Sequence, residues 1–287
     1  MLSGDCMNDR HVIEALGKAE VVIENGKITY IGEPVVDYCS IFDNGQHKCD
    51  LTKEFIKSNI EKRIDEFGMC TPQRSIDVED TMSFGTSETL KTNMIKGNID
   101  CVVGACEGVG TLLINDAEIV QGVGGRVSAL ISTTPIKEVM EKVGRENVLN
   151  PETAELNPLK GLEMAIERGY KNIAITIIPT EMVKDLRQYP KPDDVNIYIF
   201  VAHTTNVSKK EAEMLFDYAD VISGCSSINM RQTAEERKPY YSGKKVPLYA
   251  VSENGKKLLN ERLEYIGYEL CEKKYPQDFT QSPKPLI

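Results

Sequence analysis

The feature that most constrains the fold is a series of short, continuously apolar segments separated by helical patterns. In the last third of the chain these segments lie at residues 173–178, 195–202, 221–223 and 248–251, and none alternates regularly between apolar and polar positions. Strands that are apolar on both faces are typical of a parallel sheet covered by helices on both sides. We therefore expect an α/β fold built on a largely parallel sheet with helices on both faces.

The same alternation of strand and helix begins near residue 83. The pattern predicts a helix over residues 87–96 and a strand over residues 99–105. Farther along, Thr134 stands before a proline and an amphipathic segment, as a residue that caps a helix does. Ser208 and Glu211 have the spacing of a capping box. These signals indicate a sequence of helices that connect the strands.

The first part of the chain has a different pattern. Asn25 and Gly26 separate two strand-like segments, and this dipeptide favours a tight hairpin turn. Thr52 precedes an amphipathic helix predicted over residues 53–66, which Gly68 would end. We expect a small N-terminal β-containing portion. The predicted domains are residues 1–80, with a hairpin and a helix, and residues 81–287, with the α/β sheet.

Composition and charge exclude several classes of partner. The 287-residue chain is 41% apolar and 27% charged, which is ordinary for a globular protein. A net charge of −10 argues against a nucleic-acid partner and against an anionic membrane surface. The longest apolar runs, such as residues 197–202, are far shorter than a membrane-spanning helix. The first residues lack the pattern of a secretion signal, so we expect a cytoplasmic protein.

Polar residues gather directly after several predicted strands. In open α/β sheets, ligands bind beyond the carboxyl ends of the parallel strands. Glycine clusters permit a close approach of the backbone, and an adjacent arginine suits an anion. We therefore expect a site for a small anionic ligand, formed by Glu107, Gly108, Gly110, Gly124, Gly125, Arg126, His203, Thr204 and Ser226.

Each of these candidates has an alternative explanation. The glycine-rich run at residues 107–111 precedes a strand rather than a helix, so it could be a tight turn between two strands. The segment at residues 124–126 could be a turn with an exposed arginine. His203 could serve only to satisfy a backbone carbonyl group. The chain has no Gly-x-Ser-x-Gly, Walker or His-Glu-x-x-His motif, so a hydrolase is poorly supported.

The chain has eight cysteines, and the absence of a secretion signal makes disulfides an unsuitable explanation. They are either buried, reduced thiols or, in part, ligands of an iron–sulfur cluster or another soft metal. No Cys-x-x-Cys motif is present. Cys101 and Cys106 would point to opposite faces of one strand and could not share an ion. The metal candidates are those expected in turns or at strand ends: Cys39, Cys70, Cys106 and Cys225.

Several stretches of the chain resemble methanogenesis marker protein 8, an archaeal family of unassigned biochemistry. The similar stretches occur in order at residues 17–27, 32–39, 64–72, 83–88, 107–111, 120–126, 202–205 and 250–255. The chain has Leu16 where the family pattern has a cysteine, and Ser40 where it has a proline. The first difference weakens any cluster that needs a cysteine at position 16.

The resemblance implies an anaerobic archaeon and an accessory role in methane metabolism, such as enzyme maturation or cofactor handling. A partner would then be a small anionic ligand or a component of a methanogenic enzyme. A shorter likeness, at residues 83–103, is to the beta subunits of deazaflavin-linked hydrogenases, which bind flavin and iron–sulfur clusters. Three functions therefore stay open: an accessory binding protein, a flavin- or deazaflavin-linked oxidoreductase, and a structural partner without catalysis.

Overall fold

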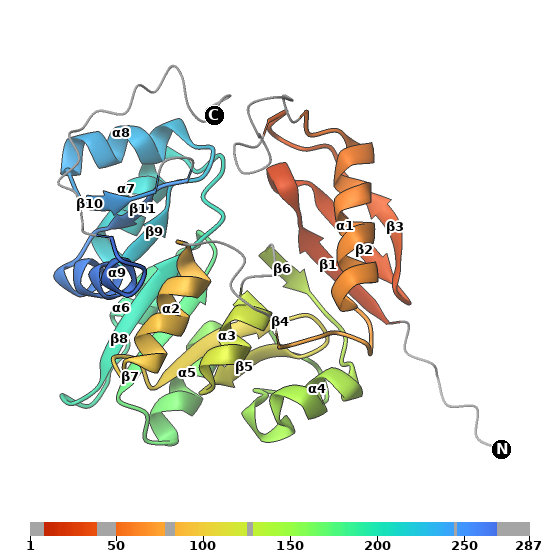
Figure 1. The fold of residues 1–287 in the computed structure, drawn as a ribbon, viewed down its shortest axis with the longest axis horizontal. Helices are drawn as coiled ribbons and strands as arrows, with labels where there is room; N and C mark the ends of the chain where they lie inside the picture. The colour runs from red at the N-terminus through yellow and green to blue at the C-terminus, as the bar shows by residue number, and fades with distance from the viewer. Residues whose placement is uncertain (1–8, 39–49, 78–83, 125–128, 244–245, 269–287) are drawn as a thin grey trace.

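Two β-sheets with helices packed on them form the protein (Figure 1). The computed structural model describes residues 9–38, 50–77, 84–124, 129–243 and 246–268. A four-stranded sheet lies beside a seven-stranded one, and the expected mixed α/β class is confirmed. In the part of the chain that is described, no helix combines the length and the apolar character needed to cross a membrane.

The small sheet is antiparallel throughout and has the order β3-β2-β1-β6. Its strands are β1 (Arg10–Glu14), β2 (Glu20–Glu24), β3 (Lys27–Ile31) and β6 (Ala129–Ser132), and the short helix η1 (Leu16–Lys18) connects β1 to β2. Asn25 and Gly26 have φ angles of +50° and +70°, which confirms the predicted hairpin between β2 and β3. Because β6 belongs to this sheet, the predicted division at residue 80 separates one of its strands from the other three. That division stays a prediction.

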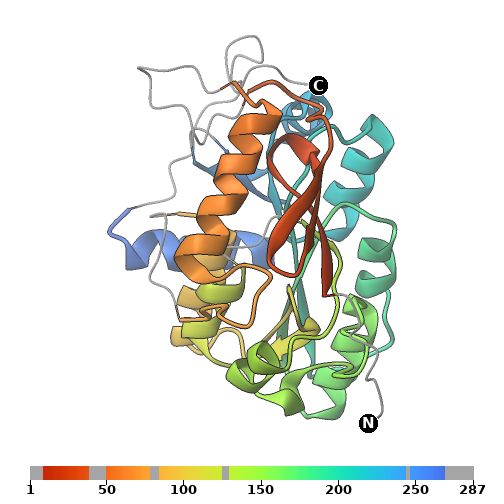
Figure 2. The ribbon, with the colours of Figure 1, turned by 90° about the vertical axis from the view of Figure 1, so that its right-hand side faces the viewer.

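Helix α1 (Lys53–Phe67) packs on the small sheet, as Figure 2 shows. The hydroxyl of Thr52 accepts a hydrogen bond from the Phe55 N–H group, and Gly68 ends the helix at a φ of +72°. Both helix boundaries were predicted from these residues. The buried side chains of Ile56 and Ile60 contact the apolar face of β1 and β2, and the sheet and helix share a core.

The large sheet has the order β10-β11-β9-β8-β7-β4-β5. Four strands at its centre are parallel: β9 (Val221–Ser223), β8 (Asn196–Val201), β7 (Asn172–Ile177) and β4 (Cys101–Cys106). Three strands toward its edges are antiparallel to their neighbours: β5 (Gly110–Ile114), β11 (Leu248–Ala250) and β10 (Tyr240–Ser242). The sheet is therefore mixed, and the expectation of a largely parallel sheet is corrected.

Chain connectivity explains this correction. Only residues 107–109 separate β4 from β5, which is far too short for a crossover to a parallel neighbour. Strand β11 follows β10 in a hairpin and also pairs antiparallel to β9. The residues that follow β11 consequently lie at the opposite edge of the sheet from those that follow β7, β8 and β9.

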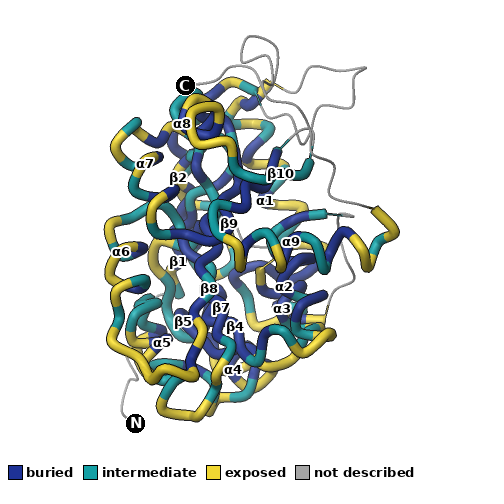
Figure 3. The backbone as a smooth tube through the Cα atoms, turned by 90° about the vertical axis from the view of Figure 1, so that its left-hand side faces the viewer, coloured by how far each residue is buried: buried dark blue, intermediate teal, exposed yellow. Residues whose placement is uncertain are grey.

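Helices cover both faces of the large sheet, as expected. One face carries α5 (Pro158–Glu167), α6 (Met182–Arg187), α7 (Lys209–Tyr218) and α8 (Ile228–Arg237). The other carries α2 (Thr86–Ile95), α3 (Ala117–Gly124), α4 (Lys137–Val143) and α9 (Glu253–Tyr265). Along β7, Ile173 and Ile175 enter the first core and Ala174 enters the second. Figure 3 shows the buried central strands and the exposed outer turns of the helices.

The structure tests the predicted N-caps of two helices. Ser208 and Glu211 form the predicted capping box at the start of α7. The prediction that Thr134 caps a helix is wrong, because α4 begins at Lys137. The Thr134 hydroxyl instead accepts a hydrogen bond from the Arg10 N–H group at 2.8 Å. It therefore ties the segment after β6 to β1.

Candidate functional site

A cavity of about 400 Å³ lies where the two sheets meet. Three parallel strands of the large sheet, β4, β7 and β8, contribute residues at or near their carboxyl ends. Strand β6 of the small sheet contributes Ala129, Leu130 and Ile131. The starts of α2 and α5 and the end of α3 complete the wall. The cavity therefore occupies the edge of the sheet at which α/β proteins bind ligands.

The described part of the wall of this cavity carries no full charge near pH 7. Aliphatic side chains dominate it, and no aspartate, glutamate, lysine or arginine occurs among the described residues that line it. Hydroxyl groups supply most of its polar side chains, and they belong to Thr86, Ser87, Thr111, Thr176 and Thr180. A cavity of this size and composition can hold a small organic molecule that has an apolar body and a few polar groups.

Among the described residues of the wall, His203 has the one side chain that titrates near neutral pH. It lies two residues after β8 and has a φ of +59°, a left-handed conformation that is uncommon outside glycine. Removal of the ring from bulk water lowers the pKa of His203 to about 4, and the positive charges of Arg63 and Lys18 act in the same direction. The ring is therefore neutral near pH 7, so one of its nitrogens can accept a hydrogen bond from a ligand.

The loop that follows β8 is joined to the loop that follows β9. The buried hydroxyl of Thr204 donates a hydrogen bond to the carbonyl group of Ser223 and accepts one from the Cys225 N–H group at 3.1 Å. A backbone bond also joins Asn206 to Ser226 at 3.1 Å. The structure therefore brings three of the sequence-predicted residues together, namely Thr204, Ser226 and Cys225, beside His203. Of these neighbours, only His203 lines the cavity.

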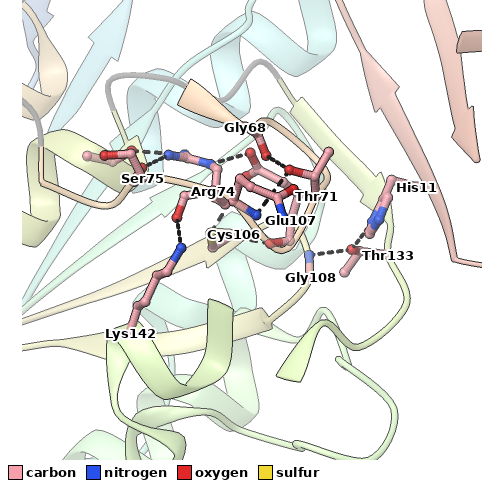
Figure 4. Close-up of polar contacts among 12 residues, drawn as sticks. His11, Gly68, Thr71, Arg74, Ser75, Cys106, Glu107, Gly108, Thr133 and Lys142 are labelled. Carbon is pink, nitrogen blue, oxygen red and sulfur yellow. Dashed lines mark hydrogen bonds and ion pairs between the residues drawn. The ribbon is translucent and has the colours of Figure 1, made fainter. Parts of the chain in front are cut away.

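Glu107, the first residue after β4, belongs to a separate, buried cluster (Figure 4). Its carboxylate accepts a hydrogen bond from Arg74 Nε at 2.5 Å, and both side chains are fully buried. Arg74 also donates to the carbonyl groups of Ser75 and Gly122. Burial opposes the charge of the guanidinium, but the Glu107 carboxylate outweighs this effect and raises the pKa of Arg74. The pair connects the segment after α1 to the β4–β5 turn and to α3.

A second network adjoins this ion pair and connects β1 to the segment after β6. The hydroxyl of Thr133 lies 2.6 Å from His11 Nδ1 and accepts a hydrogen bond from the Gly108 N–H group at 2.7 Å. The other ring nitrogen of His11 lies 2.7 Å from a carboxylate oxygen of Asp9. Burial lowers the pKa of His11, although Asp9 and Glu107 oppose this effect. Figure 4 shows His11 pointing toward Thr133, beside the β4–β5 turn.

The cysteine candidates occupy two different places. Cys70 and Cys106 lie in the Arg74–Glu107 cluster, where burial and the Glu107 carboxylate raise the pKa of each thiol. Cys225 lies in the loop after β9 and is partly exposed, whereas Cys39 falls outside the described residues. Within the described ranges, no group of three or more histidine, cysteine or acidic side chains is arranged to hold a metal ion. A metal role for these cysteines stays a prediction.

The predicted glycines have different surroundings. A Cβ atom on Gly108 would lie 2.8 Å from Ile136, and one on Gly110 would lie 2.2 Å from the Ala154 carbonyl oxygen. Both have positive φ angles, so the tight-turn alternative accounts for their residue type. Gly124 lines the cavity. Gly125 and Arg126 fall outside the described residues.

Sequence reasoning missed several residues of these two places, including the hydroxyl groups of the cavity wall. Lys18 and Arg63, whose charges act on His203, belong to the small sheet and its helix, far from His203 in the chain. Arg74 and His11 carry no local signal either, since each is a single polar residue in a turn or strand. Partners separated by more than thirty residues can be found only when the fold brings them together.

Comparison with known proteins identifies the family. A profile of the family described as "Uncharacterized protein conserved in archaea (DUF2099)" matches residues 11–264. The uncharacterized protein MJ0054 of Methanocaldococcus jannaschii is 37% identical over 283 residues, a match that covers 97% of this chain and all of that relative. The similarity thus spans both sheets and the cavity between them. The chain belongs to the DUF2099 family of proteins conserved in archaea.

Proposed function

We propose that this protein binds a small organic molecule in the cavity between its two sheets. The observation that carries this proposal is the position of the cavity at the carboxyl ends of β4, β7 and β8. Its volume of about 400 Å³ and its mostly aliphatic wall suit an apolar body, while the hydroxyl groups and the neutral ring of His203 offer a few directional contacts.

We further propose that the protein is a cytoplasmic accessory protein of methanogenic metabolism that holds this molecule for an enzyme or for its maturation. The resemblance to methanogenesis marker protein 8, the archaeal family and the relative from Methanocaldococcus support this context. Binding without catalysis fits the site best, because His203 is the only acid–base side chain among the described residues that line the cavity.

Native mass spectrometry of anaerobically purified protein tests the proposal. We expect the wild-type chain to carry a small organic molecule. The variant Ala105→Leu should lose this molecule, because position 105 lines the cavity and the larger side chain occupies part of its volume. A matched control is Ala117→Leu at the start of α3, which lies outside the cavity wall and should keep the molecule.

The ultraviolet–visible spectrum of the same sample separates the alternatives. A flavin or a deazaflavin would absorb at its own characteristic wavelengths and would support an oxidoreductase. An iron–sulfur absorption, together with iron and sulfide in elemental analysis, would support a metal role for the cysteines. Repeated recovery of folded protein without any bound molecule, and with no affinity for apolar probes, would refute the binding proposal and leave a structural partner.

A further inference from the structure

A second pocket lies at the opposite end of the parallel strands, where β7 and β8 begin. Its volume of about 280 Å³ is close to the lower end of the range for ligand pockets, about 300–1,000 Å³. Amide side chains from four places in the fold line it: Asn98 after α2, Asn172 at the start of β7, Asn196 at the start of β8 and Asn254 in the first turn of α9. No described residue lines both this pocket and the cavity at the carboxyl ends of the strands.

The carboxylate of Asp100 fixes the orientation of the Asn172 amide. One oxygen of Asp100 accepts hydrogen bonds from the backbone N–H group of Asn172 at 2.8 Å and from its Nδ2 atom at 3.2 Å. An ionised carboxylate can only accept, so the amide turns its nitrogen to Asp100. The amide oxygen then accepts a hydrogen bond from Nδ2 of Asn196 at 3.0 Å and lies 3.5 Å from the Tyr198 hydroxyl. Asn196 thus uses a donor within the chain and keeps its side-chain oxygen for a ligand.

A second set of hydrogen bonds orients Asn98 in the same sense. The buried Asn93 donates from Nδ2 to the carbonyl groups of Thr89 at 2.8 Å and of Leu258 at 2.9 Å. Because carbonyl groups only accept, the side-chain oxygen of Asn93 is left to accept from Nδ2 of Asn98, at 3.1 Å. Asn98, like Asn196, therefore gives a donor to the chain and keeps its oxygen.

The two sets of hydrogen bonds leave acceptor oxygens at the pocket. No described residue donates to the side-chain oxygens of Asn98, Asn196 and Tyr198. Lys257, which is exposed on α9, adds a cationic donor, and no described residue of the wall is acidic. An anion would bring its charge against the acceptor oxygens, and a cation would meet Lys257. A hydroxyl group suits both, because it can donate to an oxygen and accept from an ammonium group.

We propose that this second pocket binds a small neutral ligand with several adjacent hydroxyl groups, that is, a sugar or a cyclic polyol. The oxygens of Asn98 and Asn196 accept hydrogen bonds from its hydroxyl groups, and Lys257 donates one to it. The ring of Tyr198 offers apolar surface to the carbon atoms of the ligand. This site is independent of the binding function proposed for the cavity between the sheets.

Saturation-transfer NMR of the full-length protein with glucose and with myo-inositol tests this proposal. We expect at least one of these two probes to bind the wild type. Asn196→Ala should weaken that binding by about two- to tenfold, the size expected for the loss of one hydrogen bond. Asn254→Trp should abolish it, because the indole occupies part of the pocket. Both positions are exposed, so both variants should fold as the wild type does.

Two controls locate the binding. Asn115→Ala removes an exposed asparagine that lies outside the pocket and bonds to the Tyr170 hydroxyl, and it should leave the affinity unchanged. Ala105→Leu fills the other cavity and should also leave it unchanged. The proposal is overturned if neither probe binds the folded wild type, or if Asn196→Ala and Asn254→Trp bind as the wild type does. Inorganic phosphate bound here in place of the neutral probes would overturn it equally, since the pocket would then select an anion.

Discussion

The buried pair of Arg74 and Glu107 gives the strongest stability prediction, through the substitution Arg74→Met. Methionine keeps much of the volume and removes the charge, so Glu107 stays buried without its cation. Loss of one partner from a buried ion pair costs about 3–5 kcal/mol. The variant also loses the hydrogen bond to the Gly122 carbonyl group at 2.9 Å and the stacking of the guanidinium over the Phe67 ring at 4.9 Å. We expect the free energy of unfolding to fall by about 4 kcal/mol.

Urea denaturation followed by far-ultraviolet circular dichroism measures this change, with the transition midpoint and slope compared between variants. Arg145→Met is the matched control, because Arg145 pairs with Glu152 on the surface, where both side chains are more than half exposed. The control should change stability by less than about 1 kcal/mol. The double variant Arg74→Met with Glu107→Gln should be more stable than the sum of the single changes predicts, since no uncompensated charge remains.

A loss of less than about 1 kcal/mol for Arg74→Met would refute this reasoning. Such a result would mean that water reaches Glu107 or that the carboxyl group takes up a proton at little cost. Additivity of the two single variants would be equally damaging, because residues in direct contact should be coupled.

Three further predictions test other parts of the structure. Gly122→Ala should destabilise the protein by more than about 2 kcal/mol in the same assay, because its Cβ atom would lie 1.6 Å from the Ile76 carbonyl oxygen. The control Gly124→Ala, in the same helix, should be tolerated, because its Cβ atom would make only an ordinary contact at 3.7 Å. Between pH 6.5 and 4 the unfolded chain binds a proton at His203 more readily than the folded protein does, because folding lowers the pKa of this residue, so the wild type loses stability as the pH falls. The His203→Asn variant should lose less stability over this range. Equal slopes of unfolding free energy against pH for the two proteins would contradict this. Thr204→Val should cost about 1–3 kcal/mol and raise amide exchange in the loops after β8 and β9, because it removes two buried hydrogen bonds; unchanged exchange would exclude that link.

Local chemistry made much of the fold predictable. Strand β9 has the bounds that its apolar run predicts, residues 221–223, and the hairpin at Asn25 and the capping box at Ser208 follow from their own residues and near neighbours. The prediction that Cys101 and Cys106 face opposite sides of β4 is confirmed, because they belong to different cores. In each of these cases the physical cause lies within a few residues of the feature it determines.

Neither the direction of the strands nor the full set of site residues could be predicted from such local patterns. An apolar run such as residues 248–251 has the same appearance in a parallel and an antiparallel strand, so the antiparallel pairing of β11 carried no signal. The candidate site was found in part, since Gly124 and His203 line the cavity. The cations whose charges lower the pKa of His203 and the partner of Glu107 come from the first 80 residues. Their positions depend on how the two sheets pack, which no local pattern specifies.

The polar groups around Glu107 and those around His203 have different consequences. Around Glu107, the charged groups and the Thr133 hydroxyl form hydrogen bonds within the chain. Substitutions there should therefore change the stability of the fold rather than ligand binding. Around His203, aliphatic side chains and hydroxyl groups line a volume of about 400 Å³. A group that already has internal partners gains little from a ligand, whereas a cavity with a mostly aliphatic wall and a few hydroxyl groups gains from a small molecule that has an apolar body. Because β6 belongs to the small sheet and also lines this cavity, a ligand held there would contact both sheets and should raise the stability of their association.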